Sequence, residues 1–590
     1  MPERPSATRW PASPDGRERV RTSLTTAFVD ALIEMHLRAA GCADRLDLLR
    51  SALTALLEAV DEGQVGLSLT ETFENTGLRE RIETQLRASP LLDIDGLGER
   101  PLVLEHGHLY RRQDWAAEQA LAAGLGAIAR AGREFCAVPV AGHDGWSPTA
   151  ADGEPARADE STAHAAIATI LEGLNRQQRD AVAAIRRGSL LVLSGGPGTG
   201  KTHTLAALVR TMLIARRGAR VVVAAPTGKA AVRLAEGLAG LGDRASVQVS
   251  TVHRLLGYST DGRYLRNALQ PIDADLVVVD ECSMLDSRTA ARLVEALAPN
   301  ARLVLAGDRD QLASVQAGAF FGALCQSRHP ALAAARVLLE ENFRQREAPA
   351  LTRFANAISR GLDPGSDDDA GPALQRVEPP DGARDDAGRW RPALIEILVA
   401  DALRSYRPLV GMAADARDAQ GAHEALRRFA AIRVLSTLRA GPAGAAALNQ
   451  RIVRALFGSR AEATPGRLLI IRRNHPALDL YNGDIGMVWA TGHGPVEVMF
   501  ESGRSEPLAR LPLWEDGFAL TIHQAQGSEF DRVLLLPAPA GHPMATREAL
   551  YTGATRARRA LTVYADRTSL RAAAASPGRH QLSLLARLDT

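Results

Sequence analysis

Residues 190–202 read LLVLSGGPGTGKT, and the architecture of the chain can be worked out from this stretch. A run of four apolar residues, Leu190–Leu193, stops at a glycine-rich turn that ends in Lys201 and Thr202. The turn fits the pattern G-x-x-x-x-G-K-[ST], set between a strand and a helix. Its backbone N–H groups and the following helix N-terminus would point at phosphate oxygens. The stretch therefore predicts a phosphate-binding loop, in preference to an ordinary strand-to-helix turn.

The loop also predicts which residues meet a nucleotide. Lys201 would neutralise the β- and γ-phosphates, and the Thr202 hydroxyl would bind Mg²⁺. The other nucleotide-binding positions of the loop are Gly195, Gly196, Pro197, Gly198, Thr199 and Gly200. The chain contains only two lysines, Lys201 and Lys229, among its 70 Lys+Arg residues. Because an ammonium is a compact point charge and a guanidinium a wide fork, two lysines kept in GPGTGKT and APTGKAA indicate functional positions.

Composition limits the classes of protein to consider. The length of 590 residues predicts several domains, and 46% hydrophobic residues are ample for globular cores. A net charge of +2 does not by itself indicate a nucleic-acid-binding protein, so any surface that binds nucleic acid must come from a local group of basic residues. Four scattered cysteines without a C-x-x-C pair argue against a zinc site and for a reducing compartment. Without an apolar run of about 18 residues or a signal-peptide core, we expect a cytoplasmic protein with no membrane partner.

Four apolar runs each end in a polar signature. The runs are Leu190–Leu193, Val221–Ala224, Leu276–Val279 and Leu303–Ala306, and the signatures are SGGPGTGKT, APTGKAA, DECSM and GDRDQL. Continuous Val and Leu runs indicate strands that are buried on both faces, hence a parallel sheet between helices. Ligands bind at the carboxyl ends of such strands, so the four signatures predict one site.

The acidic signatures suggest distinct chemistry. Asp280 would hold Mg²⁺ and Glu281 would orient or deprotonate an attacking water, although such a pair can also be a solvated strand end or a helix cap. Asp308 and Gln311 could report loss of the γ-phosphate to the rest of the fold. Arg344, in ENFRQ, could reach the γ-phosphate as an arginine finger, whereas a lone arginine is usually a surface charge.

The N-terminal segment carries no catalytic pattern. Two sets of apolar residues fall at helical spacing: Phe28, Leu32 and Met35, then Leu49, Leu53, Leu56 and Val60. Residues 102–104 and 109–110 predict a small hairpin, followed by an Ala-rich helix from about Asp114. His106, His108 and Tyr110 could suggest a metal site, but hairpin surface residues are the better interpretation.

A second α/β pattern begins after residue 391. Its candidate strands are Ile432–Leu435, Val533–Leu536 and Leu561–Tyr564. Between residues 467 and 513, short apolar runs are separated by Asn-Gly and Gly-rich turns, which predicts a small inserted β-barrel. A turn signal at Asp261-Gly262 predicts a projecting hairpin over 258–271.

The expected organisation follows from these patterns. It comprises a mainly helical N-terminal docking domain (1–142), a linker (143–162), a first α/β domain (163–361), a flexible loop (362–391), a second α/β domain (392–466 and 514–590) and the inserted barrel (467–513).

Taken in chain order, the motifs resemble those of superfamily-one helicases, and among them the RecD family. They are LNRQQRDAV, GGPGTGKT, APTGKAA, STVHRLLG, DECSM, GDRDQLASVQAG, ENFRQ, LTIHQAQGSEFD and YTGATRARRAL, and they run from about Leu174 to the C-terminus. The resemblance implies two RecA-like P-loop motor domains with ATP and Mg²⁺ in the cleft between them. It also implies an SH3-like insertion, a pin at 258–271 that splits the duplex, and 5′-to-3′ movement on single-stranded DNA.

The resemblance implies roles residue by residue. Around the nucleotide it places Gln178, which would read adenine, and Gly198, Gly200, Lys201, Thr202, Asp280, Glu281, Gln311, Arg344, Gly527, Glu529 and Arg556. Along the DNA it places Pro226, Thr227, Lys229, Thr251, His253, Thr521 and His523. Gln524 departs from the family pattern, HKSQG, and the departure concerns one basic DNA contact rather than the ATP chemistry.

Three further segments look like the exodeoxyribonuclease V alpha-chain branch of the family: LRAGPAGAAALNQRI, NHPALDLYNGDIG and PLVLEHGHLYRRQDWAAE. This implies a heterotrimer with beta and gamma chains that unwinds DNA ends in double-strand break repair and homologous recombination, with the nuclease in a partner chain. A stand-alone RecD-like 5′-to-3′ helicase is the alternative. The intact motifs disfavour a non-motor scaffold, and the second motor-like half disfavours a P-loop kinase or transporter ATPase.

Overall fold

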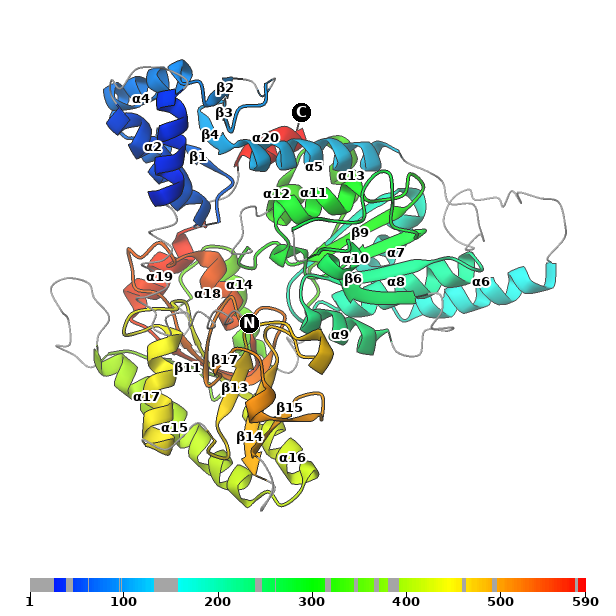
Figure 1. Ribbon diagram of the computed structural model, residues 1–590. Coiled ribbons are helices and arrows are strands. Elements are labelled where there is room, and N and C mark those ends of the chain that lie inside the picture. The colour runs from blue at the N-terminus through cyan, green and yellow to red at the C-terminus, as the bar shows by residue number, and fades with distance from the viewer. Residues whose placement is uncertain are drawn as a thin grey trace, which may run out of the picture. The chain divides into compact units, whose positions relative to one another are not determined.

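The computed structural model describes residues 26–38, 46–61, 63–94, 96, 98–131, 157–238, 247–259, 262–313, 320–343, 348–364, 371–379, 392–458, 463–490, 496–578 and 582–589. The chain divides into two compact units, drawn in Figure 1. The first holds the described residues up to Ala122 together with Asp286–Ala291, and the second holds the remainder. Each unit has a hydrophobic core of its own.

The first unit consists mainly of helices, and it also contains a four-stranded sheet, of which the sequence predicted only the hairpin. Its elements are a helix over 26–38, α2 (Leu46–Asp61), β1 (Gly66–Ser68), α3 (Leu69–Thr72), α4 (Thr76–Ala88), β2 (Leu92–Ile94), β3 (Leu102–Glu105), β4 (His108–Arg111) and the start of α5 (Arg112–Arg130). The strands pair in the order β1-β4-β3-β2, and the expected hairpin is the antiparallel pair β3–β4. Strands of three or four residues are too short for their periodicity to be seen in the sequence.

The apolar face of the helix over 26–38 was predicted only in part. Leu32 is buried, but Phe28 and Met35 are 48% and 50% exposed. The buried stripe runs through Val29 and Ile33 instead. Because both stripes are apolar, spacing alone could not decide which one faces the core.

A six-stranded parallel sheet forms the first α/β domain, as the apolar runs predict. Its strands are β5 (Leu190–Gly195), β6 (Val221–Ala225), β7 (Val247–Thr251), β8 (Leu276–Val279), β9 (Arg302–Gly307) and β10 (Arg336–Leu339), in the order β10-β5-β9-β8-β6-β7. Its helices are α6 (Arg157–Glu172), α7 (Arg176–Arg187), α8 (Lys201–Ala215), α9 (Gly228–Gly237), α10 (Val252–Leu255), η1 (Cys282–Met284), α12 (Phe320–Gln326) and α13 (Pro330–Ala334). Helix α11 (Ser287–Glu295) begins in the first unit and ends in this one. β5, β6, β8 and β9 are buried along their whole length, as expected for strands covered on both faces.

The structure differs from one expectation at the border of this domain and gives the detail of a second one inside it. Helix α6 begins at Arg157, inside the predicted linker 143–162, and packs against α8. In the predicted hairpin over 258–271, the described residues form two isolated antiparallel bridges, Tyr258 with Tyr264 and Asn267 with Gln270, and not a regular ladder.

The second α/β domain has a five-stranded parallel sheet in the order β11-β20-β19-β12-β18. The strands are β11 (Leu374–Val377), β12 (Ile432–Ser436), β18 (Ala519–Thr521), β19 (Phe530–Leu536) and β20 (Ala557–Tyr564). The helices are α14 (Pro349–Ser359), α15 (Pro392–Asp415), α16 (Ala419–Ala430), α17 (Ala445–Phe457), α18 (Arg547–Ala554), α19 (Arg567–Ala575) and α20 (Leu582–Asp589). β11 lies inside the predicted flexible loop 362–391, because its short run LQRV pairs with the edge of β20.

The C-terminal helix α20 packs against α12 of the first α/β domain, although the sequence assigned it to the second. A carboxylate oxygen of Asp589 accepts hydrogen bonds from the Ser327 hydroxyl and the Arg328 amide, both at 2.7 Å. A short helix at a chain end is recruited by whichever surface offers contacts, and local sequence does not record that choice.

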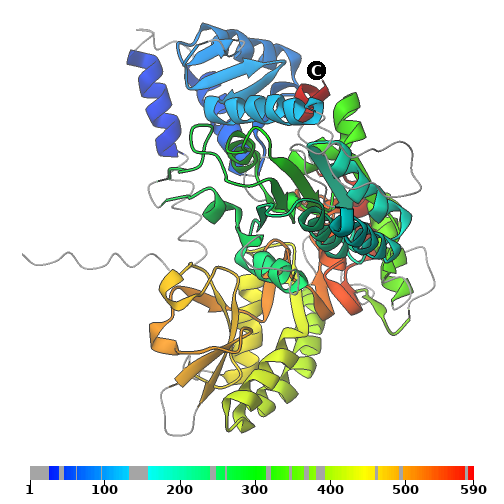
Figure 2. The same ribbon diagram turned by 90° about the vertical axis from the view of Figure 1, so that its right-hand side faces the viewer.

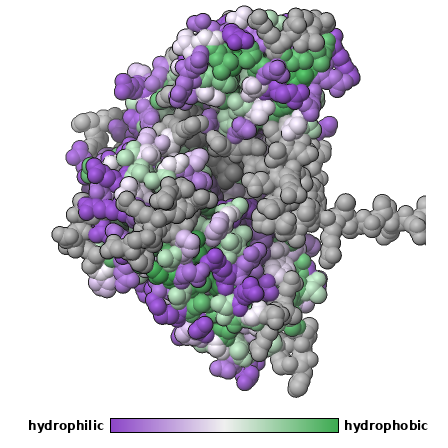
Figure 3. Space-filling view, turned by 90° about the vertical axis from the view of Figure 1, so that its left-hand side faces the viewer, coloured by the Kyte–Doolittle hydropathy of each residue, from purple (hydrophilic) through white to green (hydrophobic). Residues whose placement is uncertain are grey.

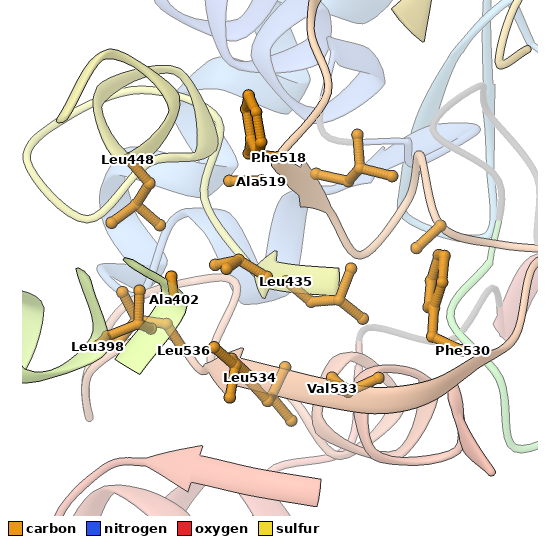
Figure 4. Close-up of a cluster of buried hydrophobic side chains, with 14 of the residues drawn as sticks. Leu398, Ala402, Leu435, Leu448, Phe518, Ala519, Phe530, Val533, Leu534 and Leu536 are labelled. Atoms are coloured by element: carbon orange, nitrogen blue, oxygen red, sulfur yellow. The ribbon is translucent and has the colours of Figure 1, made fainter. Parts of the chain in front are cut away.

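Apolar side chains from both helices and strands form the core of the second α/β domain. Figure 4 shows Leu398 and Ala402 of α15 and Leu448 of α17 around the strand residues Leu435 and Leu534. Tyr406 and Phe518 pack edge to face with ring centroids 5.1 Å apart. The Tyr406 hydroxyl is buried there and donates to the carbonyl of Phe518 at 3.2 Å.

The insertion, predicted as a small β-barrel, forms a five-stranded antiparallel sheet in its described residues. Its elements are β13 (Leu468–Ile471), η3 (Pro476–Leu478), β14 (Ile485–Ala490), β15 (Val496–Phe500), β16 (Ser505–Pro507), η4 (Leu508–Arg510) and β17 (Trp514–Asp516), with the strand order β16-β15-β14-β13-β17. The sheet extends three residues past the predicted end at 513, because Trp514 pairs with Ile471. Figure 2 shows the sheet, in orange, beside α15 and α16, and β14 contacts both helices.

The surface mixes polar and apolar residues over the face seen in Figure 3. Among the described helices, none combines the length and apolar character that crossing a bilayer requires.

Asn449 of α17 ties the helix to the return of the chain from the insertion. Its amide donates to the carbonyls of Asp516 and Ala519 at 2.9 and 2.8 Å and accepts from the Ala519 N–H at 2.7 Å. We expect Asn449→Ala to leave three buried backbone groups unpaired and to lower the free energy of unfolding by about 2–4 kcal/mol. Urea denaturation measures the shift. The control is Arg451→Ala in the same helix, which breaks only an exposed ion pair with Glu396 and should cost less than about 1 kcal/mol.

Candidate functional site

The glycine-rich loop has the backbone that its sequence predicts. β5 ends at Gly195 and α8 begins at Lys201. Gly198 and Gly200 have φ of 80° and 82°, in the left-handed region that favours glycine. A Cβ on Gly195 would lie 2.6 Å from the Thr199 hydroxyl and 2.9 Å from Leu339 Cβ, so only glycine fits there. The loop is thus a tight turn that opens onto a helix N-terminus, the geometry that binds phosphate.

The Lys201 side chain folds back over the loop. Its ammonium donates to the carbonyls of Gly195 and Gly196 at 2.6 and 3.2 Å. These two weak neutral partners can be exchanged for a phosphate, to which an ammonium binds more strongly. Thr202, the next helical residue, is exposed.

Gln178 lies against the loop, although it comes from α7. Its side chain is 2% exposed and completes a capping box with Asn175, accepting from the Asn175 N–H at 3.1 Å. Its amide nitrogen lies 3.5 Å from the Thr199 carbonyl, and a Cβ on Gly200 would contact it at 2.6 Å. The structure therefore brings the predicted adenine-reading residue to the phosphate loop.

Asp280 and Glu281 follow β8, two strands away from β5. Burial, reinforced by Glu281 and opposed by Lys201, raises the pKa of Asp280 to about 6. The Lys201 ammonium thus lies near enough to act electrostatically on this carboxylate. Glu281 has φ of 55°, a strained conformation for a residue with a side chain, and its Oε2 is buried without a hydrogen-bond partner among the described residues.

Asp308 and Gln311 follow β9, which lies between β5 and β8. Asp308 Oδ2 accepts from the Gln311 amide at 3.1 Å and from the Tyr551 hydroxyl at 3.2 Å. Burial, opposed by Lys201, raises the pKa of Asp308. In the described part of the chain, Gln311 Oε1 is also buried without a partner. Two such acceptors, together with Asp280 and the Thr202 hydroxyl, fit a hydrated Mg²⁺ and a water.

The second α/β domain forms hydrogen bonds with the segment that follows β9. The backbone N–H of Leu312 donates to the Thr552 hydroxyl of α18 at 2.7 Å, and its carbonyl accepts from the Gln526 amide at 2.6 Å. Tyr551, the neighbour of Thr552, reaches Asp308. Tyr551, Thr552 and Gln526 lie in the motifs YTGATRARRAL and LTIHQAQGSEFD, but nothing in the sequence singled them out, because their partners are supplied by the other domain.

A cavity of about 410 Å³ opens along the seam between the two α/β domains, where the phosphate loop and the segment after β9 face α14 and α18. One wall consists of the loop residues Gly195, Gly196 and Pro197, and another of α14 and the end of α18. Its volume is in the range of small-molecule sites.

The other residues predicted to meet the nucleotide have different partners. Arg556 is 2% exposed and donates to the carbonyls of Thr552 and Ser528 at 3.1 and 3.2 Å. Glu529 forms an ion pair with Arg558 at 3.1 Å, and the Gly527 carbonyl accepts from Arg233 of α9 at 2.5 Å. Arg344 lies outside the described residues.

The predicted DNA residues of the first domain cap two helices. Pro226 directly follows β6 and precedes the first cap residue, Thr227. Thr227 accepts from the Ala230 N–H at 3.2 Å at the start of α9, and Thr251 accepts from the Arg254 N–H at 3.3 Å at the start of α10. β6 and β7 are neighbours, so both caps lie at one edge of the sheet. The ring of His253 packs edge to face on Tyr258, and the rings of Tyr258 and Tyr264 are tilted at 48° with centroids 5.0 Å apart.

In the second domain, Gln524 organises the turn after β18. Its carbonyl oxygen accepts from the Thr521 N–H at 2.8 Å and from the Thr521 hydroxyl at 3.1 Å. Burial lowers the pKa of His523 to about 4, so its ring is neutral at pH 7 and brings no positive charge to a phosphate. The glutamine found in place of lysine therefore has a structural role here.

Comparison with known proteins places the chain. Residues 173–371 match the AAA domain family, and residues 516–564 match the UvrD-like helicase C-terminal domain. The RecBCD enzyme subunit RecD of Mycobacterium tuberculosis is 37% identical over 437 residues, covering 68% of this chain and 71% of that protein. The chain belongs to the RecD family of DNA helicases.

Two other proteins extend the picture of this RecD-family chain. The ATP-dependent RecD2 DNA helicase of Deinococcus radiodurans is 34% identical over 396 residues, covering 66% of this chain and 48% of that protein. The solved structure of a Bacteroides Pif1 helicase in complex with ADP-AlF3 and ssDNA has a TM-score of 0.39 at 17% identity, covering 67% of this chain and 94% of that one.

The Leu312 contacts predict a coupling defect when one of them is removed. Thr552→Val keeps the shape of the buried side chain and removes the acceptor for the Leu312 N–H. We expect DNA-stimulated ATP turnover to fall about five- to tenfold, the equivalent of one lost hydrogen bond, with little change in KM for ATP. The control is Thr555→Val, whose hydroxyl bonds only within its own helix end, to the Thr552 carbonyl. Equal losses in the two variants would contradict a coupling role for Thr552.

Proposed function

We propose that this chain is an ATP-driven motor that moves 5′ to 3′ along single-stranded DNA and unwinds duplex ends as the alpha chain of an exodeoxyribonuclease V complex. The observation that carries the proposal is the pair of hydrogen bonds that Thr552 and Gln526 form with the backbone of Leu312, which links the phosphate-loop domain to the second α/β domain. Leu312 lies in the same short segment after β9 as Asp308 and Gln311. A change at the γ-phosphate that moves this segment would therefore move the second domain as well. These two domains would be the RecA-like motors, and the inserted sheet would be an SH3-like subdomain.

ATP would bind at the phosphate loop with Lys201 on its β- and γ-phosphates. Thr202 and Asp280 would hold Mg²⁺, which when bound screens the phosphate charge. Glu281 and Gln311, with their buried unpartnered oxygens, would position the attacking water. Arg556 would turn from its carbonyl partners toward the γ-phosphate as the domains close, joined by Arg344.

The DNA would lie across the edge formed by the ends of β6, β7 and β18. Backbone N–H groups at the starts of α9 and α10 and the hydroxyls of Thr227, Thr251 and Thr521 suit phosphate oxygens. His253 and Tyr258 offer aromatic faces on which bases can stack. These contacts are indifferent to base identity, so binding should tolerate any sequence and weaken with salt.

The partners would be the beta and gamma chains, with the nuclease in a partner chain and a cytoplasmic location. Several relatives carry the name RecBCD enzyme subunit RecD, which supports this assignment. The first unit offers a docking surface: Phe28 and Met35 are seven residues apart on one helix face, and both are about half exposed. The likeness to RecD2 keeps a stand-alone helicase as the second candidate.

The nucleotide assignment predicts the effect of removing one lysine. Lys201→Gln takes away the only side-chain cation that the described structure directs onto the loop carbonyls. We expect ATP hydrolysis to fall by at least about 100-fold, since a transition-state charge contact is lost, while the circular dichroism spectrum is unchanged. Retained DNA-stimulated hydrolysis would disprove the site assignment.

The proposed polarity and assembly are tested together. Co-expression with candidate beta and gamma chains should yield a stoichiometric complex that unwinds DNA ends. In that complex, and with the partner motor inactivated, a duplex with a 5′ tail should be unwound and one with a 3′ tail should not. Robust unwinding of the 5′-tailed duplex by the isolated chain, without co-purification, would instead support a stand-alone helicase.

A further inference from the structure

One of the two lysines, Lys229, is held by the inserted sheet. It lies in the first turn of α9, after the cap residue Thr227. Its ammonium donates to a carboxylate oxygen of Glu501 at 2.8 Å. Glu501 follows β15, so the contact joins residues 272 positions apart in the chain. Lys229 is 23% exposed and Glu501 35%, so the pair is partly shielded from solvent.

A second contact fixes the same approach. The ring of Tyr481, from the turn before β14, lies over Gly228: a Cβ on Gly228 would be 3.3 Å from its Cγ. The Tyr481 backbone is held by the carboxylate of Asp484 at 2.7 Å. The inserted sheet thus covers the N-terminal turn of α9 through two separate loops.

The electrostatics favour a carboxylate at this place. Burial acts to raise the pKa of Glu501, but attraction by Lys229, aided by Arg433 and Arg233, outweighs it and lowers the pKa below the ordinary value. Arg233, about one turn after Lys229 in α9, also donates a hydrogen bond to the Gly527 carbonyl. Glu501 therefore sits among cationic groups that would otherwise attract another anion.

A helix N-terminal turn with a lysine beside it is also a site for a phosphate. The Glu501 carboxylate is the ion-pair partner of the Lys229 ammonium, and Lys229 is one of the residues proposed to contact DNA. A carboxylate and a phosphate cannot both take that partner at full strength, so the two anions must exchange.

We infer that Glu501 stands in for a DNA phosphate at Lys229 and closes the inserted sheet over α9 until a DNA strand displaces it. This inference rests on the proposed function, because it takes Lys229 as a DNA contact. Displacement releases the insertion from the first motor domain as the strand enters. The Glu501 carboxylate therefore opposes DNA binding, and its removal tightens binding.

Zero-length carbodiimide coupling tests the contact directly. A carbodiimide activates a carboxylate, which then forms an amide with an adjacent amine. The chain has only Lys201 and Lys229 as lysine donors, so the crosslinked peptide is unambiguous. We expect a Lys229–Glu501 crosslink in the full chain without DNA, and at least a fivefold lower yield with saturating oligo(dT). A yield that does not change with DNA would overturn the inference.

A double-mutant cycle tests the competition. By fluorescence anisotropy with labelled oligo(dT), Glu501→Gln should bind about three- to fivefold more tightly than the unaltered chain, as expected for a partly exposed ion pair. In the Lys229→Gln background, the same change should have no effect. The matched control is Glu424→Gln on α16, which packs against β15; its carboxylate pairs with Arg427 and Arg428, and its loss should leave affinity unchanged.

The outcomes separate this inference from the function on which it rests. Tightening of equal size in both backgrounds, or in the control, would show a general charge effect and overturn the inference alone. Weaker binding by Glu501→Gln would overturn it by making Glu501 a supporting residue for DNA. A chain that neither binds DNA nor hydrolyses ATP would overturn the proposed function, even if the crosslink formed.

Discussion

Parallel strands deliver their carboxyl ends to one edge of a sheet, and the site of this protein depends on that constraint. β5, β9 and β8 lie side by side in the sheet. Lys201, Asp280 and Asp308 follow these strands and therefore meet, although they are far apart in the sequence. Burial raises the pKa of both aspartates, and the partly buried Lys201 ammonium opposes the shift at each of them. Such a group of charges is tolerable only where a ligand completes it.

Buried polar atoms without hydrogen-bond partners at this edge also indicate a ligand site. The buried oxygens of Glu281 and Gln311 have no partner among the described residues, and the backbone of Glu281 is strained. A folded protein removes such costs unless function requires them. The second α/β domain adds hydrogen bonds to Leu312 and Asp308 from outside, so the state of the phosphate site and the position of that domain are linked.

The near-neutral charge of the chain makes local electrostatics decisive. With a net charge of +2 over 590 residues, affinity for a DNA strand must come from a few placed groups. Lys229, which is proposed to be one of them, forms an ion pair with Glu501 of the inserted sheet. If Lys229 contacts DNA as proposed, a strand must compete with the Glu501 carboxylate for the same ammonium.

The sequence by itself determined the local chemistry: the buried Val and Leu runs, the glycines that need positive φ, the acidic strand ends and the helix caps Thr227 and Thr251. Each of these depends on a few consecutive residues. The edge strands β7, β10, β11 and β18, the sheet in the first unit and the choice of α12 as the partner of α20 were decided by tertiary structure, because short runs are stabilised only by the neighbour they pair with. The same holds for Tyr551, Thr552, Gln526 and Glu501. A hydrogen bond or ion pair between residues hundreds of positions apart has no signature in the sequence near either partner.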